Sequence, residues 1–267
     1  DLTRYLESER FSDYYQALVE AYRAASVRTS RDAESFGVDG EGLAPLIDRL
    51  LGGARLQQCP ANGRRLVGLI APHLDYGRGG PCYLPAYRAL ADSGPVQRVV
   101  LLGTNPFGHS TSVVATGKDF ETPLGTTRTD RAFLAELERR CGLDLCEDEF
   151  DHLREHSVEL QLIVLQHLLG PQSFTIVPVL CPDPCGPTGT APCDGKGVDL
   201  RVFAGALGET LRAEQEGLRT LVIAGADLSH FGRRFGDDRD LSEAFLAEVE
   251  AKDRSALGAV VAGRLDV

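Results

Sequence analysis

The fold is decided by the stretch Leu66-Val67-Gly68-Leu69-Ile70-Ala71-Pro72-His73-Leu74-Asp75-Tyr76, an apolar run that ends in a polar cluster. Short runs rich in Leu, Val and Ile are typical of buried strands. Similar runs occur at residues 98–102, 112–116, 174–180 and 218–224, and helical patterns lie between them at residues 83–91, 130–140, 157–169 and 200–211. This alternation predicts an α/β fold in which helices sandwich a central, mostly parallel or mixed sheet.

Both ends of the chain are expected to be helical. Apolar residues recur at three- and four-residue intervals between Leu2 and Tyr22, which predicts a helical arm over residues 1–30. A second helix is predicted at residues 42–51, and residues 241–265 predict one helix or two with a break near residues 252–254. We therefore expect an N-terminal arm, suited to face a partner, followed by a single α/β domain over residues 31–267.

The composition limits the classes of function. The net charge is −11, and Asp and Glu are spread along the chain, which argues against the clustered basic face of a nucleic-acid-binding protein. The longest apolar runs are too short for a membrane span and the first residues are too charged for a signal peptide, so we expect no membrane partner and a cytoplasmic location. The 7 cysteines are irregularly spaced, which predicts mostly reduced thiols.

Polar clusters follow two of the predicted strands. In one, His73 and Asp75 project to the same side of an extended segment, as a metal ligand and its carboxylate partner or a proton-transfer pair would. In the other, Asp227 and His230 follow the strand at residues 218–224. Ligands of such sheets bind where the carboxyl ends of the strands meet, so we expect both clusters at one edge. The alternative for His73 is a hydrogen bond to loop backbone alone.

Another cluster, His152-Leu153-Arg154-Glu155-His156-Ser157-Val158-Glu159, lies at or before the start of a predicted helix. A helix would place His152 and His156 one turn apart on the same face, with Glu159 beside them, and two such imidazoles commonly bind a divalent metal. The string also matches the H-x-x-E-H pattern of inverzincin metalloproteases. The alternative is a helix cap, in which Ser157 caps the helix and the glutamates favour its positive end.

Four stretches together resemble the signature segments of the MEMO family, whose bacterial members are called AmmeMemoRadiSam system protein B. They are Ala71-Pro72-His73-Leu74-Asp75-Tyr76, Phe120-Glu121-Thr122-Pro123-Leu124-Gly125, Glu155-His156-Ser157-Val158-Glu159-Leu160-Gln161 and Asp227-Leu228-Ser229-His230-Phe231-Gly232. The resemblance covers about residues 30–250. It implies the α/β fold of the class III extradiol ring-cleaving dioxygenases, the LigB-like fold, with a pocket where those enzymes hold non-haem iron. Family members usually continue beyond the position of Val267, which also implies a chain that could be truncated at its C-terminus.

The family's ligand set carries over only in part. His73 lies at the position of the first metal-ligand histidine of the family. Pro106 stands where the second ligand histidine is expected, so that His109 would have to replace it from three residues away. Ser229 stands where the third ligand is often a cysteine, and a neutral hydroxyl is a poor ligand. His73, His156 and His230 could form a different trio, and we expect their imidazoles to converge in one pocket.

Three functions remain open at this stage. The first is a MEMO-like protein whose histidine pocket binds a metal, such as Fe(II) or another divalent ion, or a small-molecule or peptide ligand. In this pocket, Asp75, Glu159 and Asp227 would be partners of the histidines or catalytic groups. The second is a non-haem iron oxidoreductase, for which Pro106 and Ser229 are contrary evidence. The third is a non-catalytic interaction protein with a decayed site.

Overall fold

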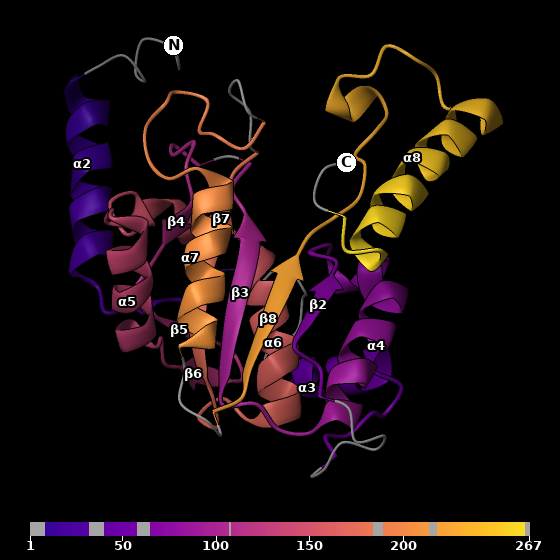
Figure 1. The fold of residues 1–267 in the computed structure, drawn as a ribbon, viewed down its shortest axis with the longest axis horizontal. Coiled ribbons are helices and arrows are strands. Elements are labelled where there is room, and N and C mark those ends of the chain that lie inside the picture. Colours follow the sequence, from indigo (N-terminus) through magenta and orange to yellow (C-terminus); the bar gives the residue numbers. More distant parts are fainter. Residues whose placement is uncertain are drawn as a thin grey trace. The chain divides into compact units, whose positions relative to one another are not determined.

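A five-stranded sheet forms the centre of the fold in a computed structural model of the chain (Figure 1). Its strands are β2 (Gly68–Ala71), β3 (Arg98–Thr104), β4 (Val114–Ala115), β7 (Thr175–Cys181) and β8 (Thr220–Gly225), in the order β2-β8-β3-β7-β4. The first four strands in this order are parallel, and the short β4 runs antiparallel to β7. The structure describes residues 9–31, 40–57, 65–106, 108–183, 189–213 and 218–264.

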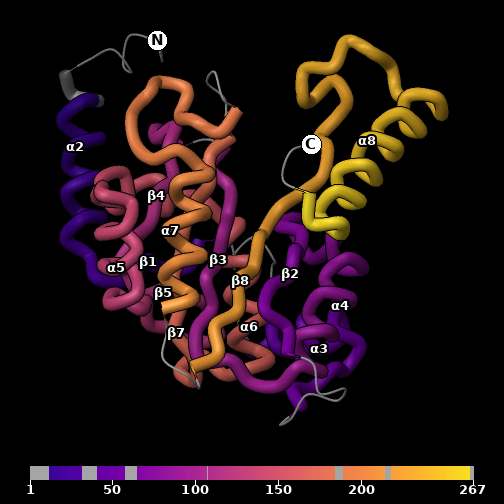
Figure 2. Tube along the Cα trace, in the orientation of Figure 1, coloured from indigo at the N-terminus to yellow at the C-terminus, as the bar shows by residue number. Residues whose placement is uncertain are grey.

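Helices cover both faces of this sheet. Along β3, Val99 and Leu101 point to one face, where they pack with α3 (Gly40–Leu50), α4 (Tyr76–Ser93) and α6 (Ser157–Leu169). Val100 points to the other face, toward α5 (Arg131–Cys141) and α7 (Leu200–Arg212). This alternation is that of a strand buried on both sides. The chain crosses from β7 through α7 to β8, as Figure 2 shows.

A second sheet has three strands, the first of which comes from the N-terminal segment. It has the order β1-β5-β6, formed by β1 (Val27–Arg28), β5 (Asp119–Thr122) and β6 (Gly125–Thr127). The helix α2 (Glu9–Ala24) precedes β1, so the arm predicted for residues 1–30 is helical over Glu9–Ala24 and then continues into a strand. The first residues of that arm, 1–8, lie outside the described residues.

The chain divides into two compact units, Asp1–Ala226 and Asp227–Val267. The first unit contains both sheets and the helices from α2 to α7. The second contains the short helix η3 (Arg233–Phe235) and the helix α8 (Glu243–Val261), whose first turn is capped by the Ser242 hydroxyl. Because α8 is continuous from its cap onward, the single helix is the correct one of the two alternatives predicted for this segment, and the helix has no break near residues 252–254. The boundary near residue 30 and the single domain after it stay predictions.

The α/β class and the mostly parallel sheet are confirmed, and one helix start is corrected. The pattern predicted a helix from residue 83, but α4 begins at Tyr76 and runs through Gly79 and Gly80. A Cβ at position 79 would lie 3.0 Å from the Leu74 Cβ, so the glycine lets the first turn pack closely against the preceding loop. Among the helices of the described part, none combines the length and apolar character that a membrane span requires.

Candidate functional site

The carboxyl ends of the parallel strands carry polar residues of the candidate site. In the first unit, His73 follows β2 and Asn105 follows β3. In an open α/β sheet this edge is where ligands bind, because loops from neighbouring strands meet there. Within the first unit, the histidine clusters predicted from the sequence lie at this edge through His73 and His156.

Hydrogen bonds hold His73 at its ring and at the residue before it. Its Nδ1 lies 3.2 Å from the Gly225 carbonyl oxygen at the end of β8, and the ring is partly buried. The preceding carbonyl, of Pro72, accepts a hydrogen bond of 2.8 Å from the Gln161 side chain on α6. A carbonyl can only accept, so Nδ1 donates in this contact; in a neutral ring with this tautomer, Nε2 has the lone pair that a metal or an acid–base reaction uses.

His156 lies beside His73. The two ring centroids are 5.9 Å apart, with an angle of 54° between the ring planes. His156 is exposed and is the residue that immediately precedes α6. The sequence therefore predicted correctly that these two clusters meet, although 83 positions separate His73 from His156 in the chain.

The placement of His152 and His156 on one helical face is wrong. His152 belongs to a separate 3-10 helix, η2 (Glu149–Leu153), and its side chain is buried, with Nε2 at 3.2 Å from the Val114 carbonyl oxygen. Burial lowers the pKa of His152; the hydrogen bond to Val114 opposes this shift and the Arg28 charge adds to it, so that the pKa lies at about 3. A neutral, enclosed imidazole of this kind is a core residue, which removes the first histidine of the inverzincin pattern.

The first turn of α6 is fixed by contacts with β3. The backbone N–H of Thr104 donates to the Ser157 hydroxyl over 3.0 Å, and the Ser157 N–H donates to the Glu155 carboxylate over 2.7 Å. Gly103 makes the close approach possible, since a Cβ there would lie 2.3 Å from the Ser157 Oγ. The Ser157 cap weighed as an alternative is therefore wrong: Ser157 is the first helical residue and binds the strand instead.

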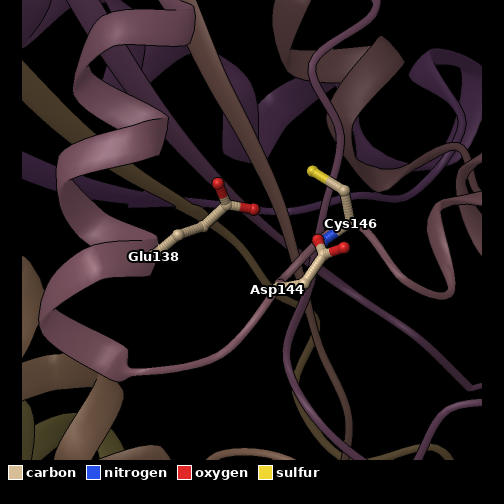
Figure 3. Close-up of side chains that lie close together, drawn as sticks. All are labelled: Glu138, Asp144 and Cys146. Carbon is tan, nitrogen blue, oxygen red and sulfur yellow. The ribbon is translucent and has the colours of Figure 1, made fainter.

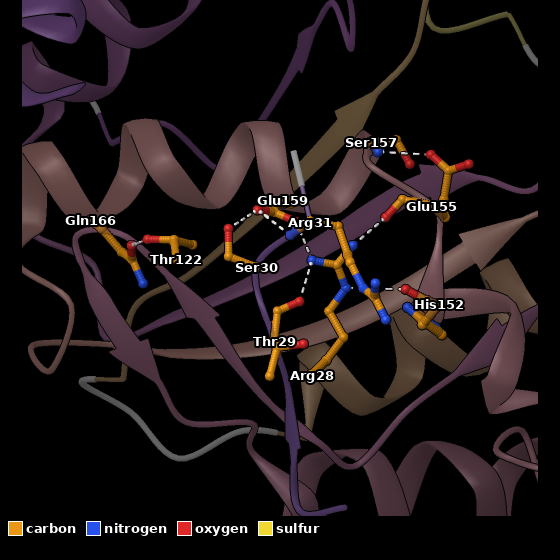
Figure 4. A network of polar contacts seen from close by, with 10 residues as sticks. All are labelled: Arg28, Thr29, Ser30, Arg31, Thr122, His152, Glu155, Ser157, Glu159 and Gln166. Carbon is orange, nitrogen blue, oxygen red and sulfur yellow. Dashed lines mark hydrogen bonds and ion pairs between the residues drawn. The ribbon is translucent and has the colours of Figure 1, made fainter. Parts of the chain in front are cut away.

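Glu159 is buried beneath this turn (Figure 4). Its carboxylate pairs with the guanidinium of Arg28, and both side chains are fully enclosed. It also accepts hydrogen bonds from the Ser30 hydroxyl at 2.6 Å and from the backbone N–H of Arg31. Glu159 thus ties α6 to the segment after β1, and its role as a partner of the histidines stays a prediction.

Asp75 caps α4. Its carboxylate accepts a 3.0 Å hydrogen bond from the Arg78 N–H and pairs with the Arg78 guanidinium. Partial burial raises the pKa of Asp75, but the contacts with Arg78 outweigh it and the pKa lies below its usual value. The structure therefore gives Asp75 a capping role, and the catalytic role stays a prediction.

In the second unit, His230 contacts Asp227, with Nε2 and the carboxylate oxygen 3.3 Å apart. Its ring also contacts Phe235, at 4.8 Å between centroids. The Ser229 hydroxyl donates to the Asp253 carboxylate on α8 over 2.6 Å, so this hydroxyl is used within the unit. Because each unit is described by itself, the convergence of His230 with the other two histidines stays a prediction.

His109 and Pro106 are both exposed. The His109 ring packs edge-on against Tyr15 of α2, with centroids 5.6 Å apart, and its backbone N–H donates to Asp151 over 2.9 Å. Asp151 also accepts from the Asn105 amide at 2.8 Å. His109 lines a polar cavity of about 310 Å³, and neither His73 nor His156 is among the residues that line it.

Another group of possible ligands is formed by Glu138, Asp144 and Cys146 (Figure 3), whose ligand atoms lie within 4.8 Å of one another. Backbone N–H groups donate to both carboxylates, and the Cys146 thiol hydrogen-bonds to Glu138. These bonds account for the cluster without an ion. The thiols of Cys82, Cys141, Cys146 and Cys181 are free, as expected, whereas Cys193 is disulfide-bonded.

Sequence reasoning missed the residues that hold the pair in place. Gln161 bonds the Pro72 carbonyl and also accepts from the Tyr87 hydroxyl at 2.7 Å. Arg28 bonds the segment before α6 from a strand of only two residues. Gln161 is a polar residue between Leu160 and Leu162 in a mostly apolar helix, which was a usable signal, whereas no local pattern distinguishes Arg28 from exposed arginines.

The fold and the site together define an α/β protein with an imidazole pair at the carboxyl edge of a mostly parallel sheet. Comparison with known proteins narrows this class. The chain belongs to the Memo-like protein family, whose family model matches residues 44–264. The resemblance seen in the sequence is thereby confirmed, while the LigB-like fold stays a prediction.

Similar proteins carry the same family name. A MEMO1 family protein of Methanopyrus kandleri is 38% identical over 204 residues, which are 73% of this chain and 66% of the relative. One of Methanocaldococcus jannaschii is 34% identical over 62% of this chain and 54% of the relative, and one of Aquifex aeolicus is 29% identical over 64% and 41%. The chain thus spans less than two thirds of the length of these curated relatives, at 66%, 54% and 41%.

Proposed function

We propose that this MEMO-like protein binds a divalent metal ion through His73 and His156. The observation that carries the proposal is the contact between His73 Nδ1 and the Gly225 carbonyl, 3.2 Å long, beside a second imidazole at 5.9 Å between centroids. Metal-binding histidines typically donate their other ring N–H to a carbonyl or carboxylate, which fixes the tautomer and the ring orientation.

The spacing of the rings fits shared ligation. With metal–nitrogen bonds of about 2.1 Å, two imidazoles on one tetrahedral ion have centroids roughly 5 Å apart. The observed 5.9 Å is slightly wider, and the exposed His156 ring can close the difference by rotation. Two nitrogen ligands suit Fe(II), Zn²⁺ or Co²⁺, with further positions for water or a small-molecule ligand.

The alternatives carry less support. An oxidoreductase needs positions for a substrate and for oxygen, and an interaction protein needs a partner surface. No contact among the described residues favours either of them over a binding pocket. The activity of the pocket therefore stays unassigned in this proposal.

Cobalt binding tests the proposal directly. Untagged protein is titrated with Co²⁺ without oxygen, following the visible absorbance of the ion, for the wild type and for His73→Ala, His156→Ala and His167→Ala. The matched control is His167, which lies on α6 but bonds Asp48 at 2.7 Å instead of the pair. We expect about one equivalent in the wild type and in the control, with affinity at least about tenfold weaker in the two site variants.

Two results would contradict metal binding by His73 and His156. A wild type that binds neither Co²⁺, Zn²⁺ nor Fe(II), or four proteins that bind Co²⁺ alike, would overturn the proposal. His230→Ala in the same titration tests the separate prediction for that residue.

A further inference from the structure

Arg28 makes an unusual set of contacts for a residue in a two-residue strand at the edge of a three-stranded sheet. Its side chain is fully buried, with the guanidinium 5.4 Å from the centre of the Phe120 ring. Nε donates to the His152 carbonyl over 3.1 Å, and one terminal nitrogen donates to the Glu155 carbonyl over 2.9 Å. The other terminal nitrogen pairs with the Glu159 carboxylate (Figure 4).

These contacts lie on both sides of His156 in the chain. The Glu155 carbonyl belongs to the peptide bond that leads into His156, and Glu159 lies in the first turn of the helix that follows it. One guanidinium therefore holds the backbone before the exposed His156 imidazole and, through the Glu159 carboxylate, the first turn of the helix after it. The position of the His156 imidazole depends on the turn between η2 and α6, and the buried Arg28 side chain bonds to both ends of this turn.

We propose that Arg28 is the positioning residue of the pocket, which sets where the His156 imidazole lies relative to His73. This inference rests on the proposed function, because positioning matters for a shared ligand. Arg28 lies before the residues that the family model matches, 44–264, and within the segment expected to be a separate arm. The N-terminal segment is thereby part of the site.

The geometry requires arginine in particular. Its planar fork donates in several fixed directions at once, so it can bond two carbonyls and a carboxylate together. A lysine ammonium at the same place could pair with Glu159 but could not also reach the His152 and Glu155 carbonyls in the same directions. Arg28→Lys thus keeps the buried charge pair while it releases the turn.

The test compares Arg28→Lys with two controls. Arg98→Lys alters another mostly buried ion pair, between Arg98 and Asp130, whose side chains are 12% and 18% exposed. Arg98 is the first residue of β3, at the opposite end of the strand from the site. Ser30→Ala removes a hydrogen bond to Glu159 but leaves the carbonyl contacts of Arg28 intact. Both controls measure what a loss of stability alone does to the pocket.

Two measurements are made on each folded variant. Ring resonances of labelled histidines are recorded by NMR in metal-free protein, and Co²⁺ affinity is measured by titration. We expect Arg28→Lys to shift the His156 ring resonances and to weaken Co²⁺ binding about tenfold or more, as removal of an orienting contact does. Arg98→Lys and Ser30→Ala are expected to lower the melting temperature without either effect.

The His156 resonances and the Co²⁺ affinity test the positioning role and the proposed function separately. If the wild type binds no Co²⁺, the proposed function is overturned, and the metal-free resonances still decide whether Arg28 positions His156. Unshifted His156 resonances in Arg28→Lys, or equal shifts in Arg98→Lys, would overturn the positioning role. Should Arg28→Lys not fold, Glu159→Gln takes its place, and it is expected to shift His156 in the same direction by a smaller amount; no shift there overturns the proposal as well.

Discussion

Acidification is expected to destabilise this protein through His152 in particular. The imidazole is 1% exposed, lies edge-on to Phe120, and donates from Nε2 to the Val114 carbonyl. Burial, together with the nearby Arg28 charge, holds its pKa at about 3, against an ordinary value of 6.5. The folded protein therefore keeps His152 neutral at pH values where the unfolded chain protonates it.

The size of the effect follows from this difference. Because the pKa is lower in the folded state, the stabilisation is complete above 6.5 and is lost as the pH falls toward 3. The whole difference corresponds to about 5 kcal/mol, at about 1.4 kcal/mol for each pH unit. Between about pH 7 and pH 4, the free energy of unfolding should fall by about 3 kcal/mol from this residue alone.

Urea unfolding of the wild type and of His152→Gln measures this contribution. The glutamine amide can still donate toward Val114 but does not titrate, and carboxylates elsewhere affect both proteins alike. We expect the wild type to be more stable near pH 7 and to lose about 3 kcal/mol more than the variant on acidification to about pH 4. Parallel stability profiles for the two proteins would refute the assignment of this acid sensitivity to His152.

Other predictions concern packing and caps. Gly103→Ala would place a Cβ 2.3 Å from the Ser157 Oγ and should cost about 1–3 kcal/mol in urea unfolding; an unchanged midpoint would contradict the close approach. Gln161→Leu leaves the Tyr87 hydroxyl and the Pro72 carbonyl without this partner and should lower the free energy of unfolding by about 3 kcal/mol. Adding Tyr87→Phe should restore part of this loss, and no recovery would contradict the hydrogen bond between the two side chains. Ser242→Ala removes the cap of α8 and should lower the free energy of unfolding by about 1 kcal/mol. Unfolding is followed by circular dichroism, and an unchanged stability would contradict the cap.

The central strands could be predicted because burial on both faces leaves a signature. Residues 98–102 and 174–180 are short apolar runs, and they became β3 and β7 nearly unchanged. The strands of the small sheet, such as Val27–Arg28, were not predicted, since two to four residues with mixed polarity show no period. Their pairing depends on tertiary contacts that no local pattern records.

The candidate site could be predicted in position more than in detail. His73 and His156 were expected together because strand ends and helix starts meet at one edge of a parallel sheet, and they do. The spacing of His152 and His156 suggested one helix, but the turn after Leu153 separates η2 from α6 and sends the two rings in different directions. A four-residue spacing indicates a shared face only if the helix is continuous.

The contact between Arg28 and Glu159 also bears on how the protein folds. The two residues are 131 positions apart in the chain, and the Arg28 bonds to His152 and Glu155 span 124 and 127 positions. Contacts of such separation must close a long loop before they gain any energy, so we expect them to form after the local helices. During synthesis Arg28 emerges long before its partners, and the pocket is completed only when α6 has left the ribosome and docked.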